Sequence, residues 1–315
     1  TVHLTDLHLK AEALAGLDLP VEVKGGCIGK ISIDIPWTSL YYEPVLVHVE
    51  EVLVLAGPIA DRKYDPEKDK RLCRALKSRR LEDAQPPDPD APGDRPRGFM
   101  ENLATTILNN VQVSLQNVHI RYEDGVSTGD PLACGLVLQN LTAVTTNNKW
   151  KATQIDADAK SLFKLLKVES LSLYWNPRCP ANTLVKAQLN SDGWKTLLRK
   201  GLATFSINGE DFDFVVKPVS LKTKVILNKS KEAKVPKLLL DFVLQDAASQ
   251  LSRDQFVSMY QLGRAFELMS VNQRFRKYFR GLCVRGHARD YWKDAYTAVL
   301  EEYIRPYTWS RIREH

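Results

Sequence analysis

The sequence predicts a β-rich α+β protein whose main element is an elongated, strongly curved and mostly antiparallel sheet. Apolar and polar residues alternate over many short segments, as half-buried strands require. The alternation repeatedly breaks and resumes in the opposite phase, which is typical of bulged strands that keep one apolar face. Helical periodicity is confined to a few segments. We therefore expect repeating bulged strands that form an apolar groove, with a few peripheral helices.

The broken alternation occurs in at least five segments, each with two polar residues at the break. The pairs are Thr5 with Asp6, Glu50 with Glu51, Gln116 with Asn117, Gln139 with Asn140, and Glu169 with Ser170. Because side chains alternate between the faces of a strand, an uncorrected break would turn the second apolar half to the wrong side. A bulge at the polar pair restores one continuous face. The alternative is a hairpin turn at each pair, although none is the Asn-Gly or Asp-Gly type that tight hairpins prefer.

Unbroken segments predict the remaining elements. Strands are expected over residues 27–35, 212–216, 219–227 and 238–244. Helices are expected over residues 68–81, 99–109, 191–200, 253–272 and 288–304. Ser252 and Gln255 have the spacing of a capping box at the start of the fourth helix, and Gly201 is expected to end the third.

The domain organisation follows from these elements. We expect residues 1–250 to form the β-groove and residues 251–315 to form a helical segment that packs on the groove or extends it. The proline-dense stretch from about residue 82 to 98 is expected to be an extended or disordered loop within the groove region. The chain starts at Thr1 inside an alternating pattern, so we expect it to be part of a longer protein.

Composition and motifs argue against an enzyme. The net charge of +6 suits contact with an anionic surface but falls short of a nucleic-acid binder. The five cysteines have no paired spacing, and neither a nucleophile elbow nor a phosphate loop is present, so we expect no cofactor and no metal. Histidines on strands are expected to be solvated, and the acidic residues Glu123 and Asp124 to belong to a turn. The interleaved basic and aromatic residues of 274–280 resemble a nucleic-acid or membrane-surface patch, but no second such run supports it, so we interpret them as a helix terminus.

Candidate binding residues are the apolar positions of the alternating strands, which would line the groove. They are Ile31, Ile33, Ile35, Val45, Val47, Val49, Val52, Val54, Val111, Val113, Leu115, Val118, Ile120, Leu136, Leu138, Leu141, Leu171, Leu173, Leu240 and Phe242.

Several segments together resemble one family. LDLPVEVKGGCIGKISIDIPWTSLY (residues 17–41) closely resembles the signature of the chorein family, the vacuolar protein sorting thirteen proteins, which are bridge-like lipid transfer proteins. Similar matches are VQVSLQNVHIRYED (111–124), TTNNKW (145–150), LSLYWN (171–176), HARDYWKDA (287–295) and RPYTWSRIREH (305–315). These segments are spread over most of the chain.

The resemblance implies the N-terminal part of a long rod of β-groove units. Such a groove would bind the acyl chains of glycerophospholipids with little headgroup specificity and conduct lipids between membranes. It implies a peripheral protein on the cytoplasmic side of organelle membranes, at contact sites of the endoplasmic reticulum with mitochondria, endosomes or lipid droplets. Its partners would be lipids, membrane surfaces and the remainder of the same chain, and not nucleic acid. Family members start with a helix and a strand that this sequence lacks, so the groove would be open at that end.

A second hypothesis belongs to another class of function. The strands could instead close into a β-sandwich that serves as a protein-interaction scaffold without bound lipid.

Overall fold

The computed structural model describes residues 1–9, 21–39, 42–58, 67, 74, 109–125, 127–128, 130–155, 159–179, 193–204, 212–229, 236–278, 284–309 and 313. Contacts divide the chain into two units, Thr1–Ile59 with Pro92–Leu262, and Ala60–Ala91 with Gly263–His315. The predicted loop at 82–98 lies outside the described residues, as do the helices predicted at 68–81 and 99–109 apart from Arg74 and Asn109. The predicted boundary near residue 250 stays a prediction.

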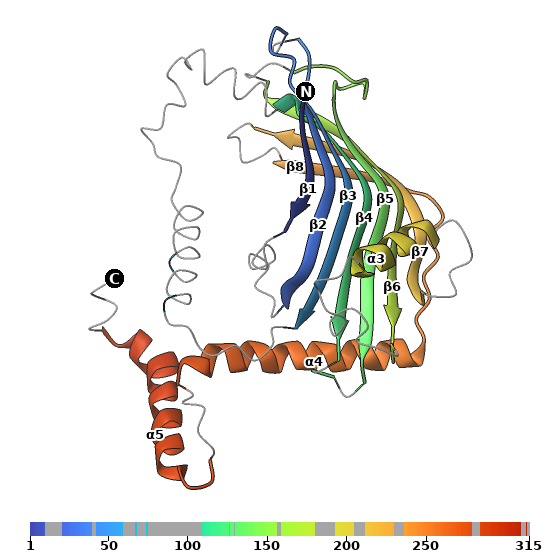
Figure 1. Cartoon of the computed structure of the whole chain (residues 1–315). Helices are drawn as coiled ribbons and strands as arrows, with labels where there is room; N and C mark the ends of the chain where they lie inside the picture. Colours follow the sequence, from blue (N-terminus) through green and yellow to red (C-terminus); the bar gives the residue numbers. More distant parts are fainter. Residues whose placement is uncertain are drawn as a thin grey trace. The chain divides into compact units, whose positions relative to one another are not determined.

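The first unit contains one eight-stranded sheet whose strands follow the order of the sequence. The strands are β1 (Val2–His8), β2 (Val21–Asp34), β3 (Leu46–Pro58), β4 (Gln112–Asp124), β5 (Leu132–Thr146), β6 (Ser161–Asn176), β7 (Phe214–Asn228) and β8 (Leu238–Leu244). Neighbours are antiparallel except β3 and β4, which are parallel. The sheet is strongly twisted, so that β8 runs across the direction of β1 to β3 (Figure 1). It is open, with β1 and β8 as its edges, and the predicted β-rich class is confirmed.

The polar pairs lie in the middle of strands, so the hairpin alternative is wrong. Asp6, Glu51, Asn117 and Ser170 have φ angles of 52°, 61°, 56° and 52°, the left-handed region that breaks strand alternation. From β1 to β6, each strand skips one residue at the same level, so pairs such as Glu50 with Gln116 and Val52 with Val118 keep their register. The pairing of β6 with β7 is irregular at this level. The predicted extra residue is therefore present, but as a line of breaks running across the sheet. We call it the break line.

The helices follow their predicted positions with altered ends. They are α3 (Gly193–Thr204), α4 (Arg253–Phe275), η2 (Arg276–Tyr278), α5 (Ala288–Val299), η3 (Leu300–Ile304) and η4 (Arg305–Tyr307). The predicted capping box of α4 is confirmed: the Ser252 amide donates to Gln255 Oε1 at 2.8 Å and the Gln255 amide donates to Ser252 Oγ at 3.2 Å. None of the helices in the described part of the chain is long and apolar enough to span a membrane.

Several sequence-based boundaries are wrong, among them the start of β2, which lies at Val21 and not at residue 27. The strands predicted at 212–216 and 219–227 form one strand, β7, because the pairing with β6 is irregular around Pro218 and does not need its missing N–H. Helix α3 continues past Gly201 to Thr204, because Leu202 packs on the core beneath it. Tertiary packing here outweighs the helix-breaking tendency of glycine.

Candidate functional site

One face of the sheet is apolar from edge to edge. Four rows of paired residues cross the strands on this face, two on each side of the break line. They are Val2, Ile33, Val47, Val113, Ala143, Leu166, Thr223 and Phe242; Leu4, Ile31, Val49, Leu115, Leu141, Val168, Leu221 and Leu244; Leu7, Ile28, Val52, Val118, Leu138, Leu171 and Val219; and Gly26, Val54, Ile120, Leu136, Leu173 and Val216. Every member except Thr223 and Gly26 has an apolar side chain. We call these rows the apolar face.

The break line is what makes this face continuous. Leu115 and Val118 are three residues apart, yet both join the same cluster, and so do Leu138 and Leu141. On a regular strand an odd separation places side chains on opposite faces. The break restores the phase on both strands, through the left-handed Asn117 on β4 and through the skipped Gln139 on β5, as the sequence pattern predicted.

The predicted binding residues are brought together by this register. Those inside paired segments all stand in the four rows, except Leu240, which pairs with Val225 beside the first row. Ile35, Val45 and Val111 flank strand ends on the same alternation. Sequence reasoning left out further members of the rows, including Leu4, Leu166 and Val168, although the broken alternation contains them. That these side chains bind lipid stays a prediction.

The apolar face is only partly shielded from solvent. Its buried cluster consists of Val118, Leu138 and Val168, and the partly buried side chains packed on them also come from strands. Ile120 and Leu173 are 38% and 40% exposed. Within the described residues, the cluster on this face is therefore made by the strands alone.

The opposite face is covered on one side of the break line. Helix α3 lies across the strands there (Figure 1) and packs Trp194 and Leu198 onto Cys27, Leu53 and Leu55. Leu53, Leu55 and Leu198 are fully buried. We call this half of the second face the covered face.

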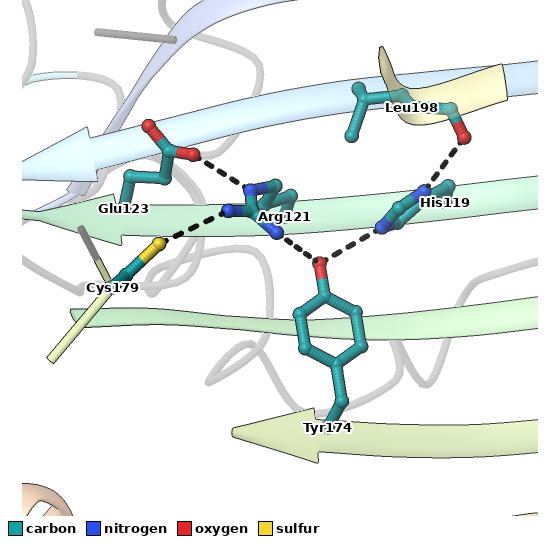
Figure 2. A network of polar contacts seen from close by, with 6 residues as sticks. All are labelled: His119, Arg121, Glu123, Tyr174, Cys179 and Leu198. Atoms are coloured by element: carbon teal, nitrogen blue, oxygen red, sulfur yellow. Dashed lines mark hydrogen bonds and ion pairs between the residues drawn. The ribbon is translucent and has the colours of Figure 1, made fainter. Parts of the chain in front are cut away.

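A polar network is buried within the covered face. Figure 2 shows its members, His119, Arg121, Glu123, Tyr174, Cys179 and Leu198. His119 Nδ1 lies 3.0 Å from the Leu198 carbonyl oxygen, and its Nε2 lies 2.9 Å from the Tyr174 hydroxyl. Arg121 donates to Glu123 Oε1 at 2.7 Å and to the Tyr174 hydroxyl at 3.3 Å. Each polar group has a partner in the interior, so the network joins the strands to α3 without leaving an unpaired charge.

Comparisons with known proteins bear on the whole chain. Residues 1–315 match the VPS13-like family N-terminal region. The chain is 32% identical to the intermembrane lipid transfer protein VPS13A of Mus musculus and 30% identical to VPS13C of the same species, covering 100% of this chain and 10% of each relative. It is 28% identical to the intermembrane lipid transfer protein VPS13 of Chaetomium thermophilum, over 99% of this chain and 10% of that relative.

The chain belongs to the VPS13 family. It spans about a tenth of the length of the curated relatives it matches. Two of the segments that carry the predicted resemblance, 111–124 and 171–176, supply both sides of this VPS13-family sheet: His119 and Tyr174 of the covered face, and Ile120 and Leu173 of the apolar face.

The covered face corrects two predictions. His119 is 1% exposed and not a solvated residue, and burial lowers its pKa from 6.5 to about 4. Glu123 is buried in an ion pair with Arg121, whereas Asp124 does take part in a turn by accepting the Ser127 amide at 2.8 Å. Sequence alternation placed both residues away from the apolar face but could not show that α3 covers them. Burial also raises the pKa of the Cys134 thiol to about 12, which makes that thiol a poor nucleophile.

Across the break line, the second face is polar. His48, Gln116, Lys167 and Lys222 are exposed there, as the alternation predicts. The same face therefore changes from solvated to helix-covered at the break line, while the apolar face keeps its character on both sides.

The basic segment in the second unit is engaged in local contacts. Arg274 donates to Glu302 Oε2 at 3.0 Å, and the Tyr278 hydroxyl donates to Glu302 Oε1 at 3.1 Å. Lys277 also pairs with Glu302. Helix α4 ends at Phe275, so the segment lies at a helix terminus, as interpreted from the sequence.

Proposed function

We propose that the apolar face of this VPS13-family chain binds the acyl chains of glycerophospholipids and conducts them between membranes, without catalysis. The observation that carries the proposal is the inverted burial on β4 and β6. Ile120 and Leu173 are 38% and 40% exposed, whereas their polar neighbours His119 and Ser172 are 1% and 0% exposed. A broad open apolar surface has a strong tendency to bind an apolar partner.

Acyl chains suit the shape and chemistry of this surface. The apolar rows, one of which crosses all eight strands without interruption, offer contacts for tails but few polar groups that could select a headgroup. Each methylene that a tail buries contributes roughly 0.8 kcal/mol, so a single chain gains several kcal/mol over a few strands. Binding is non-directional, and a tail can therefore move from row to row. Relatives named intermembrane lipid transfer proteins support this reading.

The site of action is part of the proposal. We propose that the chain works as one segment of a longer conduit, bound peripherally at contact sites where the endoplasmic reticulum meets other organelles. The scaffold hypothesis required a closed β-sandwich, whereas the described strands form a single open sheet. An open sheet leaves the apolar rows accessible, which favours lipid as the partner.

The test adds one carboxylate to either face of the same strand. Ile120→Asp places a charge on the apolar face, and Gln116→Asp places the same charge on the exposed polar face of β4. A carboxylate on the apolar face would have to be desolvated under bound tails, which costs several kcal/mol. Lipid that co-purifies with the chain, measured by mass spectrometry, is expected to fall at least tenfold in Ile120→Asp combined with Leu173→Asp.

The same measurement of lipid content serves the control variant Gln116→Asp. Gln116→Asp is expected to keep the lipid content of the wild type, and circular dichroism checks that all variants fold. Unchanged lipid in the double variant, or equal loss in Gln116→Asp, would contradict the proposal.

A further inference from the structure

One cation stands on the otherwise apolar side of the strands. Lys164 lies on β6 between Leu162 and Leu166 of the same alternation, and pairs with Thr145 and Val225. It is half-buried beside the first row of the apolar face. Among the residues of the eight described strands, it is the cation that alternation places on this face. A lysine has a long apolar stem, so its ammonium group can reach the rim while the stem packs with the rows.

The Lys164 ammonium group lies in a small polar cluster at the end of the strands. Its Nζ donates to the Val111 carbonyl oxygen at 3.1 Å. Its sheet partner Thr145 donates through Oγ1 to the Asn109 carbonyl oxygen at 2.9 Å. Lys229, the residue after β7, donates through Nζ to Asn109 Oδ1 at 2.7 Å. Two ammonium groups therefore contact the short segment from Asn109 to Val111.

Asn109 supplies an independent sign of a missing ligand. Its side chain is 6% exposed, and Lys229 fixes the orientation of the amide by donating to its oxygen. The amide nitrogen Nδ2 then has no acceptor within the described part of the chain. Buried donors in folded proteins almost always have a partner, so an unmet donor on the amide that Lys229 contacts, two residues before the carbonyl that Lys164 contacts, indicates a position that an anionic oxygen would fill.

The electrostatics of Lys164 agree with this geometry. Burial lowers its pKa, and no carboxylate among the described residues forms an ion pair with it. A half-buried ammonium group without a counter-charge is stabilised by any anion that can approach it.

We propose that Lys164, Lys229 and Asn109 form a binding site for the phosphate group of a glycerophospholipid whose tails lie on the adjoining apolar face. This rests on the proposed function and adds a headgroup contact to it. Phosphate oxygens accept several charge-assisted hydrogen bonds at once, which matches two ammonium groups and one amide donor. The site holds a phosphate at the rim, where the rest of the headgroup can stay in water.

The test compares lipids with and without a phosphate. The purified chain is titrated with phosphatidylcholine and with diacylglycerol, both carrying the same fluorophore on one tail. Lys164→Met keeps the apolar stem and removes the charge, and Lys222→Met makes the same change on the exposed opposite side of β7. We expect Lys164→Met to weaken phosphatidylcholine binding about tenfold, since a charge-assisted hydrogen bond is lost, and to leave diacylglycerol binding within about twofold.

Each outcome decides one question. Equal weakening of both lipids by Lys164→Met would mean that the lysine only supports the fold, and would overturn the site. Unchanged affinity for both lipids in Lys164→Met would also overturn it, while the apolar face as a tail-binding surface would stand. Failure of the wild type to bind either lipid would instead refute the proposed function. Lys222→Met is expected to match the wild type, and a melting curve checks each variant.

A further arm separates lipid phosphate from free phosphate. Inorganic phosphate is added to the lipid-free chain and followed by ³¹P NMR line width. Line broadening that depends on Lys164, together with equal affinity for the two lipids, would assign the site to free phosphate and overturn the lipid proposal. Displacement of phosphatidylcholine but not of diacylglycerol by the same salt supports it.

Discussion

The two faces of β4 and β6 reverse the usual distribution of polar and apolar residues. On the covered face, His119 and Ser172 are 1% and 0% exposed, and α3 packs over this half of the sheet. On the apolar face, Ile120 and Leu173, the very next residues, are 38% and 40% exposed. At these positions a polar side chain is buried and its apolar neighbour is accessible, and α3 covers the half of the face on which the polar one lies.

The difference assigns separate tasks to the faces. The covered face has fully buried leucines and a network in which each charge is paired, so it contributes much of the stability of the first unit. The apolar face contributes less on folding at positions such as Ile120 and Leu173, where the side chains keep part of their contact with water. The apolar area that stays exposed to solvent is available to a ligand, and in the proposed function acyl chains cover it.

The largest expected contrast comes from the same truncation on the two faces. Leu53→Ala removes a fully buried side chain beneath α3 and is expected to lower the free energy of unfolding by about 2–5 kcal/mol. Leu173→Ala removes a side chain that is 40% exposed and is expected to cost about 1 kcal/mol in lipid-free protein. Urea denaturation measures both values. Equal losses of the free energy of unfolding in the two variants would mean that the two faces do not differ in their contribution to stability.

An intermediate effect is expected from acid, through His119. Its folded-state pKa of about 4 is below the unfolded value of 6.5, so the unfolded chain binds the proton first. The stabilisation from neutral His119 is complete above pH 6.5 and is lost as the pH falls towards 4, by about 3 kcal/mol in all.

Two histidine variants check this assignment. His119→Gln is expected to lose less stability than the wild type between pH 7 and pH 4, measured by urea denaturation at each pH. His48→Gln changes an exposed histidine and is expected to follow the wild type. If the stability of His119→Gln falls with pH in parallel with that of the wild type, His119 is not the group responsible for the acid sensitivity.

The smallest effect is expected at the break line. Ser170 has a φ of 52°, a conformation that glycine adopts without steric cost, so Ser170→Gly is expected to raise the free energy of unfolding by about 0.5–1 kcal/mol. Ser114→Gly, within the regular part of β4, is expected to lower it by about the same amount. Urea denaturation of the two variants is expected to give changes in the free energy of unfolding of opposite sign. A lower free energy of unfolding in both variants would show that the backbone at Ser170 is not strained.

The continuity of the apolar face could be predicted because it depends on local pattern. The polar pairs at Glu50, Gln116 and Glu169 mark the positions where the alternation changes phase, and the register places those positions at one level. The path of β7 past Pro218 could not be predicted, since it depends on an irregular pairing with β6 that relieves the proline of donating a hydrogen bond.

The covered face could not be predicted for a related reason. His119, Arg121 and Glu123 alternate with apolar residues just as the exposed His48 does. Residues distant in sequence bury them: α3 packs against His119, and Arg121 contacts Tyr174 and Cys179. Local pattern therefore shows which residues share a face, and tertiary packing decides which face is open.

Photo-crosslinking a lipid through its tail shows directly which face of the sheet holds the acyl chains. Phosphatidylcholine with a diazirine on one acyl chain is bound to the purified chain, irradiated, and the adducts are located by peptide mass spectrometry. We expect adducts on the apolar face, at Ile120, Leu173 and their row neighbours, and none at the exposed Gln116 and Lys222 of the opposite face. Adducts distributed equally over both faces, or absent from the four rows, would contradict the proposed function.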